Sequence, residues 1–291
     1  MLWQQLKITV AEPEAENISE WLSEQSALSV TFSDAADTPI FEPELNTTPL
    51  WNSVVVLGLF DKDRDVKAVL AQFAEQFPQL SCIYETVADQ DWHKVWMDDY
   101  HPLQFGKNLW ICPSWCVPPK PQAVNIKLDP GMAFGTGTHA TTALCLTWLD
   151  THPPVGKQVL DFGCGSGILG LAALKLGANF VWAVDHDSQA LSATRQNMEN
   201  NAISIAQCAT LLPTELPIDL EAELILANIL ANPLLELAPQ FASLHKTDGV
   251  LVLSGILSHQ VSAILERYRQ WYTILATHYQ DDWACVVAKR L

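Results

Sequence analysis

The segment that most constrains the fold is residues 159–168, where an apolar run carrying one aspartate is followed by three glycines that alternate with small residues. This pattern is typical of a buried parallel strand that ends in a tight turn and then opens a helix. Glycines in such a turn lack side chains, so a ligand can approach the backbone closely. The segment therefore predicts an α/β domain with a site for a nucleoside-type cofactor.

Two aspartates indicate which nucleoside this site prefers. Asp185 ends the next apolar run, about 20 residues downstream, which is the spacing expected for a ribose-binding carboxylate in a dinucleotide or an S-adenosylmethionine site. Residues 165–170 also match the dinucleotide pattern G-x-G-x-x-G. Asp161, however, would repel the pyrophosphate of NAD, whereas it could attract, directly or through water, the cationic amino-acid tail of S-adenosylmethionine. We therefore favour S-adenosylmethionine; an NAD or FAD site and a simple helix cap are the alternatives.

Charge is unevenly distributed along the chain. The formal net charge is −17; residues 1–103 hold 18 acidic against 5 basic residues, whereas residues 104–291 hold 15 against 11. Such a negative surface repels phosphate backbones and attracts cationic partners, although solubility alone also explains many acidic proteins. We therefore expect a basic macromolecular partner and no direct nucleic-acid binding.

Cysteine content and apolar runs bear on the compartment. The seven cysteines are an odd number and include no C-x-x-C pair, which argues against a disulfide scaffold, and we expect no metal site. The longest apolar runs have the length of strands, and no cationic segment with an apolar stretch opens the chain. We expect a cytoplasmic monomer that does not associate with membranes.

Residues 1–88 are expected to form a separate small domain, because a chain of 291 residues is longer than a typical single domain. Apolar spacing predicts strands at residues 3–10, 26–32, 53–60 and 80–87, and helices at residues 14–25 and 63–77. This β-α-β-β-α-β order suggests a ferredoxin-like α+β domain. No catalytic motif lies in it.

Two segments connect this domain to the rest of the chain. Residues 89–103 predict a linker helix with Trp92, Trp96 and Tyr100 along one face. Residues 107–128 alternate strand-like runs around the proline-rich turn 118–121, which predicts a hairpin.

Residues 104–291 form the predicted catalytic domain. From residue 155 onward strands alternate with helices, which predicts a mainly parallel sheet covered on both faces. The seven strands are expected to be centred on Leu160, Ala183, Ala209, Ile225, Leu253, Leu275 and Val286. Only residues 279–282 separate the last two strands, too few for a parallel crossover, so these two should pair antiparallel. The arrangement looks like the seven-stranded, Rossmann-like sheet of class I methyltransferases, whereas a dinucleotide dehydrogenase would normally lack that hairpin.

Two further segments carry candidate chemistry. Residues 129–142 form a glycine- and threonine-rich loop whose central aromatic residue, Phe134, could fold over a ligand; alternatively, Thr141 or Thr142 only closes a helix end. His139 lies on the same loop and is a candidate general base. Asn228 ends the fourth strand, where its amide oxygen can accept a hydrogen bond from an amine and orient the nitrogen for methyl transfer.

Four segments together resemble the ribosomal protein methyltransferase A family, and the resemblance covers essentially the whole chain. They are DPGMAFGTGTHATT at residues 129–142, DFGCGSG at residues 161–167, AVDHD at residues 183–187 and ANILANPL at residues 227–234. The resemblance implies that the following residues contact S-adenosylmethionine: Phe134, Thr142, Gly163, Asp185 and Asn228. Asp161 and Gly165 of the glycine turn complete the expected cofactor contacts. By the same resemblance Asn228 borders the methyl acceptor, and residues 1–88 recognise the substrate.

The reaction that this resemblance implies is repeated methylation of lysine ε-amines and of the N-terminal α-amine of the large-subunit ribosomal protein L11. Many amino-group methyltransferases have Asn-Pro-Pro-Tyr where this chain has Asn-Ile-Leu-Ala, so no tyrosine is available to stack on a planar substrate. That departure favours flexible alkyl amines. The alternatives are a class I methyltransferase that acts on a small molecule or RNA, and a non-catalytic nucleoside-binding protein.

Overall fold

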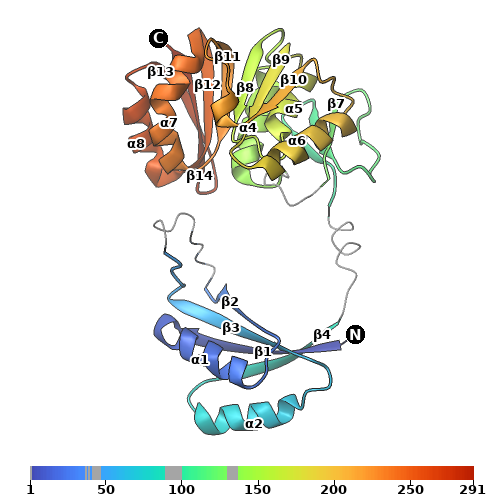
Figure 1. Ribbon diagram of the computed structural model, residues 1–291, viewed down its shortest axis with the longest axis vertical. Helices are drawn as coiled ribbons and strands as arrows, with labels where there is room; N and C mark the ends of the chain where they lie inside the picture. The colour runs from blue at the N-terminus through green and yellow to red at the C-terminus, as the bar shows by residue number, and fades with distance from the viewer. Residues whose placement is uncertain (1, 37, 39, 41–46, 89–99, 130–136) are drawn as a thin grey trace. The chain divides into compact units, whose positions relative to one another are not determined.

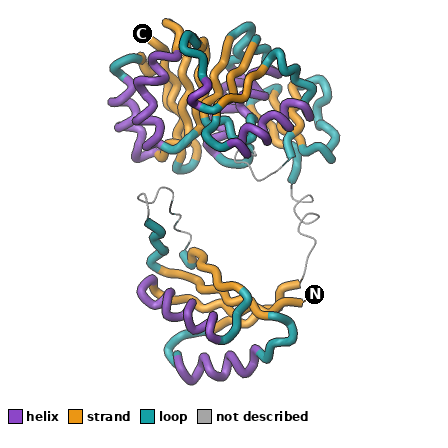
Figure 2. The backbone as a smooth tube through the Cα atoms, viewed as in Figure 1, coloured by secondary structure: helices purple, strands orange, loops and turns teal. Residues whose placement is uncertain are grey.

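The computed structural model describes residues 2–36, 38, 40, 47–88, 100–129 and 137–291. The chain divides into two compact units, Met1–Asp98 and Asp99–Leu291, each with its own sheet and helices (Figures 1 and 2). Within the described ranges, no helix combines the length and the apolar character that crossing a membrane would require.

The first unit is a four-stranded sheet with two helices, and it has the ferredoxin-like fold that the sequence predicts. Its elements, in chain order, are β1 (Leu2–Ala11), α1 (Glu12–Glu24), β2 (Ser29–Asp34), β3 (Ser53–Phe60), α2 (Val66–Gln76) and β4 (Cys82–Ala88). The strands lie in the order β2-β3-β1-β4, and every neighbouring pair is antiparallel. Both helices lie on one side of the sheet (Figure 1).

Alternation along β3 explains how this sheet buries one face. Val54, Val56, Gly58 and Phe60 are buried, whereas the residues that alternate with them are partly exposed. A strand with this period of two presents one face to a core and the other outward. Helix α1 covers the buried face with Ile18 and Trp21, and so completes the core of this unit.

A three-stranded sheet opens the second unit and corrects one prediction. Strands β5 (Leu103–Phe105) and β6 (Leu109–Cys112) pair antiparallel across a tight turn, but β7 (Val124–Lys127) pairs parallel with β6. The hairpin predicted for residues 107–128 is therefore wrong. The proline-containing segment 113–123 is long enough to return the chain and start β7 beside the beginning of β6. The linker helix remains a prediction, because residues 89–99 lie outside the described residues.

The second unit is built around a seven-stranded sheet. Its helices and strands are α4 (Ala140–Thr151), β8 (Gln158–Phe162), α5 (Ile168–Lys175), β9 (Phe180–Val184), α6 (Ser188–Asn200), β10 (Cys208–Leu211), β11 (Ala222–Asn228), α7 (Ala231–Leu244), β12 (His245–Leu257), α8 (Val261–Tyr268), β13 (Tyr272–Gln280) and β14 (Trp283–Arg290), with short 3₁₀ turns at Pro213–Glu215 and Ser258–Gln260. The strand order is β10-β9-β8-β11-β12-β14-β13. Strand β14 is antiparallel to both of its neighbours, and the remaining pairs are parallel. The class I methyltransferase sheet and its final antiparallel hairpin are thus confirmed.

Apolar residues fill both faces of this sheet. In β8, Val159 belongs to the core under α4, α5 and α6, whereas the adjacent Leu160 belongs to the core under α7 and α8. A parallel strand covered by helices on both faces is apolar at consecutive positions for this reason. The central strands are therefore rigidly held, which fixes the loops that follow their carboxyl ends.

Candidate functional site

The site lies where the strand order reverses, between β8 and β11. The two strands pair parallel, with Ala227 opposite Phe162, so the glycine turn after β8 and Asn228 at the end of β11 lie beside each other. In open α/β sheets, ligands bind outside the carboxyl ends of the strands at this reversal. The fold therefore brings together the glycine turn, Asp185 after β9 and Asn228.

The glycine turn has a backbone that only glycine adopts readily. Gly163, Gly165 and Gly167 have φ of +75°, +55° and +78°. The Val184 carbonyl accepts hydrogen bonds from the amides of Gly163 (2.7 Å) and Cys164 (3.0 Å), which ties the turn to β9. A Cβ on Gly163 would overlap the Ile229 side chain. These glycines are thus required by the turn itself, before any ligand is considered.

Asp185 links the turn to the next helix. Its Oδ2 accepts a hydrogen bond from the Gly165 amide at 2.9 Å, and its Oδ1 accepts one from the Asp187 amide at 3.0 Å. The residue is largely buried. Because a carboxylate oxygen can accept more than one hydrogen bond, each oxygen keeps capacity for a ribose hydroxyl.

Asp161 is buried beneath the glycine turn rather than at its mouth. It is 1% exposed, and its Oδ2 accepts a hydrogen bond from the Gly170 amide at 2.8 Å, in the first turn of α5. Burial raises the pKa of Asp161 to about 7, a shift opposed by the Gly170 hydrogen bond and reinforced by the negative charge of Asp185. Because Gly167 also stands at the N-cap of α5, the helix-capping alternative describes part of what these residues do. The predicted interaction of Asp161 with a cationic ligand stays a prediction.

Among the described residues, the Asn228 side-chain amide is bonded through its nitrogen and not through its oxygen. Its Nδ2 donates a hydrogen bond to the Thr142 Oγ1 at 3.1 Å, and Thr142 is fully buried in the first turn of α4. Its Oδ1 is buried and finds no hydrogen-bond donor among the described residues. A buried amide oxygen without a partner is costly, and its place at the end of a central strand makes it a candidate acceptor for the N–H or O–H group of a ligand.

The residue that caps the start of α4 is neither Thr141 nor Thr142, so the alternative in which one of these threonines closes the helix end does not hold. The N-cap is His139, whose Nδ1 accepts the Thr141 amide at 3.4 Å and lies 2.8 Å from the Thr141 Oγ1. Burial lowers the pKa of His139, which keeps the ring neutral and able to accept these bonds. His139 therefore organises α4, and its Nδ1 is already engaged. Phe134 falls outside the described residues.

Sequence reasoning missed Ser254 and Gly255 on β12. Asn228 pairs with Ser254 in the sheet, and the Ser254 Oγ donates a hydrogen bond to the Thr141 carbonyl at 3.0 Å. The available signal was a serine and a glycine that interrupt the apolar run of residues 250–257. In a central strand such an interruption often marks a bulge or a close backbone approach.

Comparisons with known proteins agree along the length of the chain. A family model described as "Ribosomal protein L11 methyltransferase (PrmA)" matches residues 2–291. Proteins named "Ribosomal protein L11 methyltransferase" from Shewanella sp. (strain ANA-3) and Shewanella sediminis (strain HAW-EB3) are 49% and 50% identical, and the matches cover 100% and 98% of each chain. The crystal structure of a ribosomal protein L11 methylase from Lactobacillus delbrueckii subsp. bulgaricus superposes with a TM-score of 0.60 at 34% identity, covering 66% of this chain and 99% of the other.

Proposed function

The chain belongs to the ribosomal protein L11 methyltransferase (PrmA) family, and on that premise we propose that it transfers methyl groups from S-adenosylmethionine to lysine ε-amines and to the N-terminal α-amine of ribosomal protein L11. The observation that carries the proposal is the Asn228 Oδ1, a buried acceptor without a donor among the residues that the structure describes. A primary amine supplies the N–H that this oxygen lacks.

An asparagine suits this task better than an aspartate would. A carboxylate beside a lysine ammonium would favour the charged form, which has no lone pair for attack, and would raise its pKa. The neutral Asn228 amide accepts an N–H without adding that charge. The Thr142 hydroxyl, which receives the Asn228 Nδ2 hydrogen, fixes the amide so that its oxygen is the atom left for the amine. These residues therefore orient an amine rather than deprotonate it.

The residues at the strand ends fit S-adenosylmethionine. Asp185 would bind the ribose hydroxyls, while Thr142, Gly163, Gly165 and Asn228 would line the rest of the ligand, and the resemblance adds Phe134. Asp185 supplies negative charge, which suits a cation and opposes a pyrophosphate. When bound, S-adenosylmethionine supplies an electrophilic methyl group on a sulfonium.

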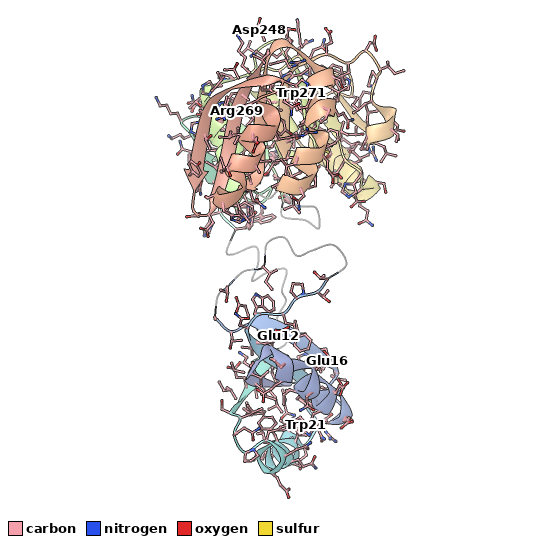
Figure 3. The ribbon with its side chains drawn as sticks, turned by 90° about the vertical axis from the view of Figure 1, so that its left-hand side faces the viewer. Glu12, Glu16, Trp21, Asp248, Arg269 and Trp271 are labelled. Carbon is pink, nitrogen blue, oxygen red and sulfur yellow. The ribbon has the colours of Figure 1, made fainter. Side chains whose placement is uncertain are left out.

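The first unit supports a basic protein as the methyl acceptor. Helix α1 carries five exposed glutamates and no lysine or arginine; Figure 3 labels two of them, Glu12 and Glu16. Residues 1–88 would serve as the recognition domain, since a negative surface accelerates encounter with a cationic partner. The same charge opposes RNA as the substrate.

The experiment is a methylation assay with a labelled donor and three acceptors in parallel: purified ribosomal protein L11, ribosomal RNA and a small-molecule extract. Label in L11, released by digestion as methylated lysine and methylated N-terminal residue, supports the proposal. Label confined to RNA or to small molecules refutes it and leaves the corresponding alternative. If no acceptor takes up label although the donor binds, the chain is a nucleoside-binding protein instead.

A further inference from the structure

Strand β12 contains a bulge immediately beside Asn228. In the antiparallel pairing of β12 with β14, Leu253 is opposite Val286 but Ile256 is opposite Ala284, so Ser254 and Gly255 together face a single residue. A bulge of this kind bends a strand and re-aims the groups around it, and bulges are frequent next to active sites. On its other edge β12 pairs with β11, where Ser254 is the partner of Asn228.

Gly255 allows the backbone after Asn228 to approach β12 closely. Its φ is +82°, and a Cβ there would overlap the Ile229 carbonyl oxygen. The Ile229 side chain in turn reaches Gly163, where a Cβ would overlap it as well. Ile229 is thus held between the bulge and the glycine turn, and its position sets that of the neighbouring Asn228.

Ser254 holds the turn of α4 that carries Thr142, the hydrogen-bond partner of the Asn228 amide. The fully buried Ser254 Oγ lies 3.0 Å from the Thr141 carbonyl oxygen and 3.3 Å from that of Ala284, so it ties the first turn of α4 to β14. The next residue of α4, Thr142, accepts a hydrogen bond from the Asn228 Nδ2. The bulge therefore influences the Asn228 amide in two ways: through Ile229, the next residue in the chain, and through Thr142, which bonds the Asn228 Nδ2.

We propose that the Ser254–Gly255 bulge of β12 is the positioning device of the acceptor site, which orients the Asn228 amide so that its oxygen receives the amine. The proposal rests on the proposed function. Ser254 and Gly255 act through Asn228 and Thr142, and neither needs to touch the amine. A misplacement on the order of 1 Å can slow a reaction by about a hundredfold, so small shifts of the bulge are measurable.

The test compares two variants of the full-length protein with matched controls. Ser254→Ala removes the buried hydroxyl. Its control is Tyr268→Phe, which removes another buried hydroxyl; this one donates to the Leu234 carbonyl at 2.7 Å in the core under α7 and α8. Gly255→Ala adds a Cβ at the close approach. Its control is Gly156→Ala, at φ +73° with nothing within 4 Å of the added atom, which isolates backbone strain from overlap.

Two readouts separate positioning from stability. The first is the single-turnover rate of L11 methylation beside the dissociation constant for S-adenosylmethionine. The second readout, which needs no methyl acceptor, is NMR spectroscopy of protein labelled with ¹⁵N-asparagine. It follows the two side-chain amide signals of Asn228, which are identified because they are missing in Asn228→Asp. We expect Ser254→Ala to slow methylation about tenfold and Gly255→Ala about a hundredfold. Donor affinity should change far less, and the Asn228 signals should shift in both variants and in neither control.

The proposal is overturned if Ser254→Ala keeps the wild-type rate and unshifted Asn228 signals while its unfolding midpoint falls as in Tyr268→Phe. It is equally overturned if rate and donor affinity fall together. Should Gly255→Ala fail to fold, Ser254→Ala alone decides. If the wild-type protein does not methylate L11, the proposed function fails, and the Asn228 signals still decide the role of the bulge.

Discussion

The two ends of the seven-stranded sheet each bury one polar side-chain atom that has no hydrogen-bond partner among the described residues, but they surround that atom differently. At the carboxyl ends of β8 and β11, the Asn228 oxygen lacks a donor among the described residues. At the end where β12 begins, which Figure 3 marks with Asp248 and Trp271, the His245 Nε2 is the atom without a partner, but the neighbouring polar groups bond one another: the Tyr272 hydroxyl lies 3.1 Å from the His245 Nδ1, and the Arg290 Nε donates to the Ala242 carbonyl at 3.2 Å. The Asn228 oxygen lies beside the glycine turn, whereas His245 lies among the protein's own bonded side chains.

Each end also holds a buried group with a shifted pKa, and the pKa values of Asp161 and His245 move in opposite directions. Burial raises the pKa of Asp161 to about 7. Burial, together with the positive charge of Arg290, lowers the pKa of His245 to about 4, against the weaker effect of the Glu223 and Val250 carbonyls. Both groups are therefore neutral over much of the acidic range, which is how each end tolerates a titratable group without an ion pair.

The largest expected effect is on the pH dependence of stability. His245 binds fewer protons in the folded state, so its contribution rises by about 3 kcal/mol as pH increases from about 4 to 6.5. Asp161 keeps its proton when folded, so its contribution of about 4 kcal/mol is lost as pH increases from about 4 to 7. In the wild-type protein these two effects nearly cancel.

Single variants should expose each contribution. We expect the unfolding free energy of Asp161→Asn, minus that of the wild type, to increase with pH between 4.5 and 6.5. The same difference for His245→Gln should decrease over this range. Urea unfolding at several pH values measures both. Two differences with the same sign would show that the ends of the sheet do not oppose each other.

Next in size is the loss of the acceptor amide. Asn228→Ala should slow methyl transfer to ribosomal protein L11 about a hundredfold, which corresponds to about 2.7 kcal/mol, because the amine loses the oxygen that orients it. Asn125→Ala is the control, since the Asn125 side chain donates only to the Lys120 and Ala123 carbonyls in the second unit's small sheet. Equal rates for both variants in single-turnover assays would remove Asn228 from the acceptor site.

A smaller effect is expected in the core under α7 and α8. Tyr268→Phe removes a buried hydrogen bond to the Leu234 carbonyl and should lower the unfolding free energy by about 1 kcal/mol. Donor affinity measured by calorimetry should not change, because the hydroxyl belongs to the core under α7 and α8 and bonds the Leu234 carbonyl rather than a site residue. A weakened affinity would mean that this core communicates with the site.

The smallest effect is proton release on donor binding. A cation near Asp161 favours its charged form and lowers the pKa of its carboxyl from about 7. At pH 7, binding of S-adenosylmethionine should therefore release up to about half a proton. Calorimetry in two buffers with different ionisation enthalpies measures this number, which should vanish in Asp161→Asn and persist in His245→Gln.

Local patterns predicted the order of elements correctly and missed what depends on distant partners. Apolar spacing located the strands of the four-stranded and the seven-stranded sheet, and the short connection 279–282 predicted the antiparallel β13–β14 pair, since four residues allow no other return. The parallel pairing of β6 with β7 was missed because a proline-containing loop does not reveal how far the chain travels before it returns. The depth of Asp161 depends on packing by α5, and the bulge in β12 depends on a register with β14 that lies about 30 residues away in the chain.

In the candidate site, too, the sequence predicted the features that depend on neighbouring residues and missed those that depend on distant partners. Glycines with positive φ and the aspartate that follows β9 are local requirements of the turn, so their places followed from the sequence. The hydrogen bond between Asn228 and Thr142 joins residues 86 positions apart, and no local pattern encodes it. Ser254 escaped notice for the same reason, because its partner, Thr141, lies 113 positions earlier in the chain.

The place of β14 has a consequence for how the protein is made. This strand comes last in the chain among the seven strands of its sheet, yet it lies between β12 and β13 rather than at an edge. Until residues 283–290 emerge, β12 has no partner on that side, and the bulge beside Asn228 has nothing to form against. A nascent chain can therefore complete its first unit during translation, but it becomes competent for methyl transfer only after the final strand has left the ribosome.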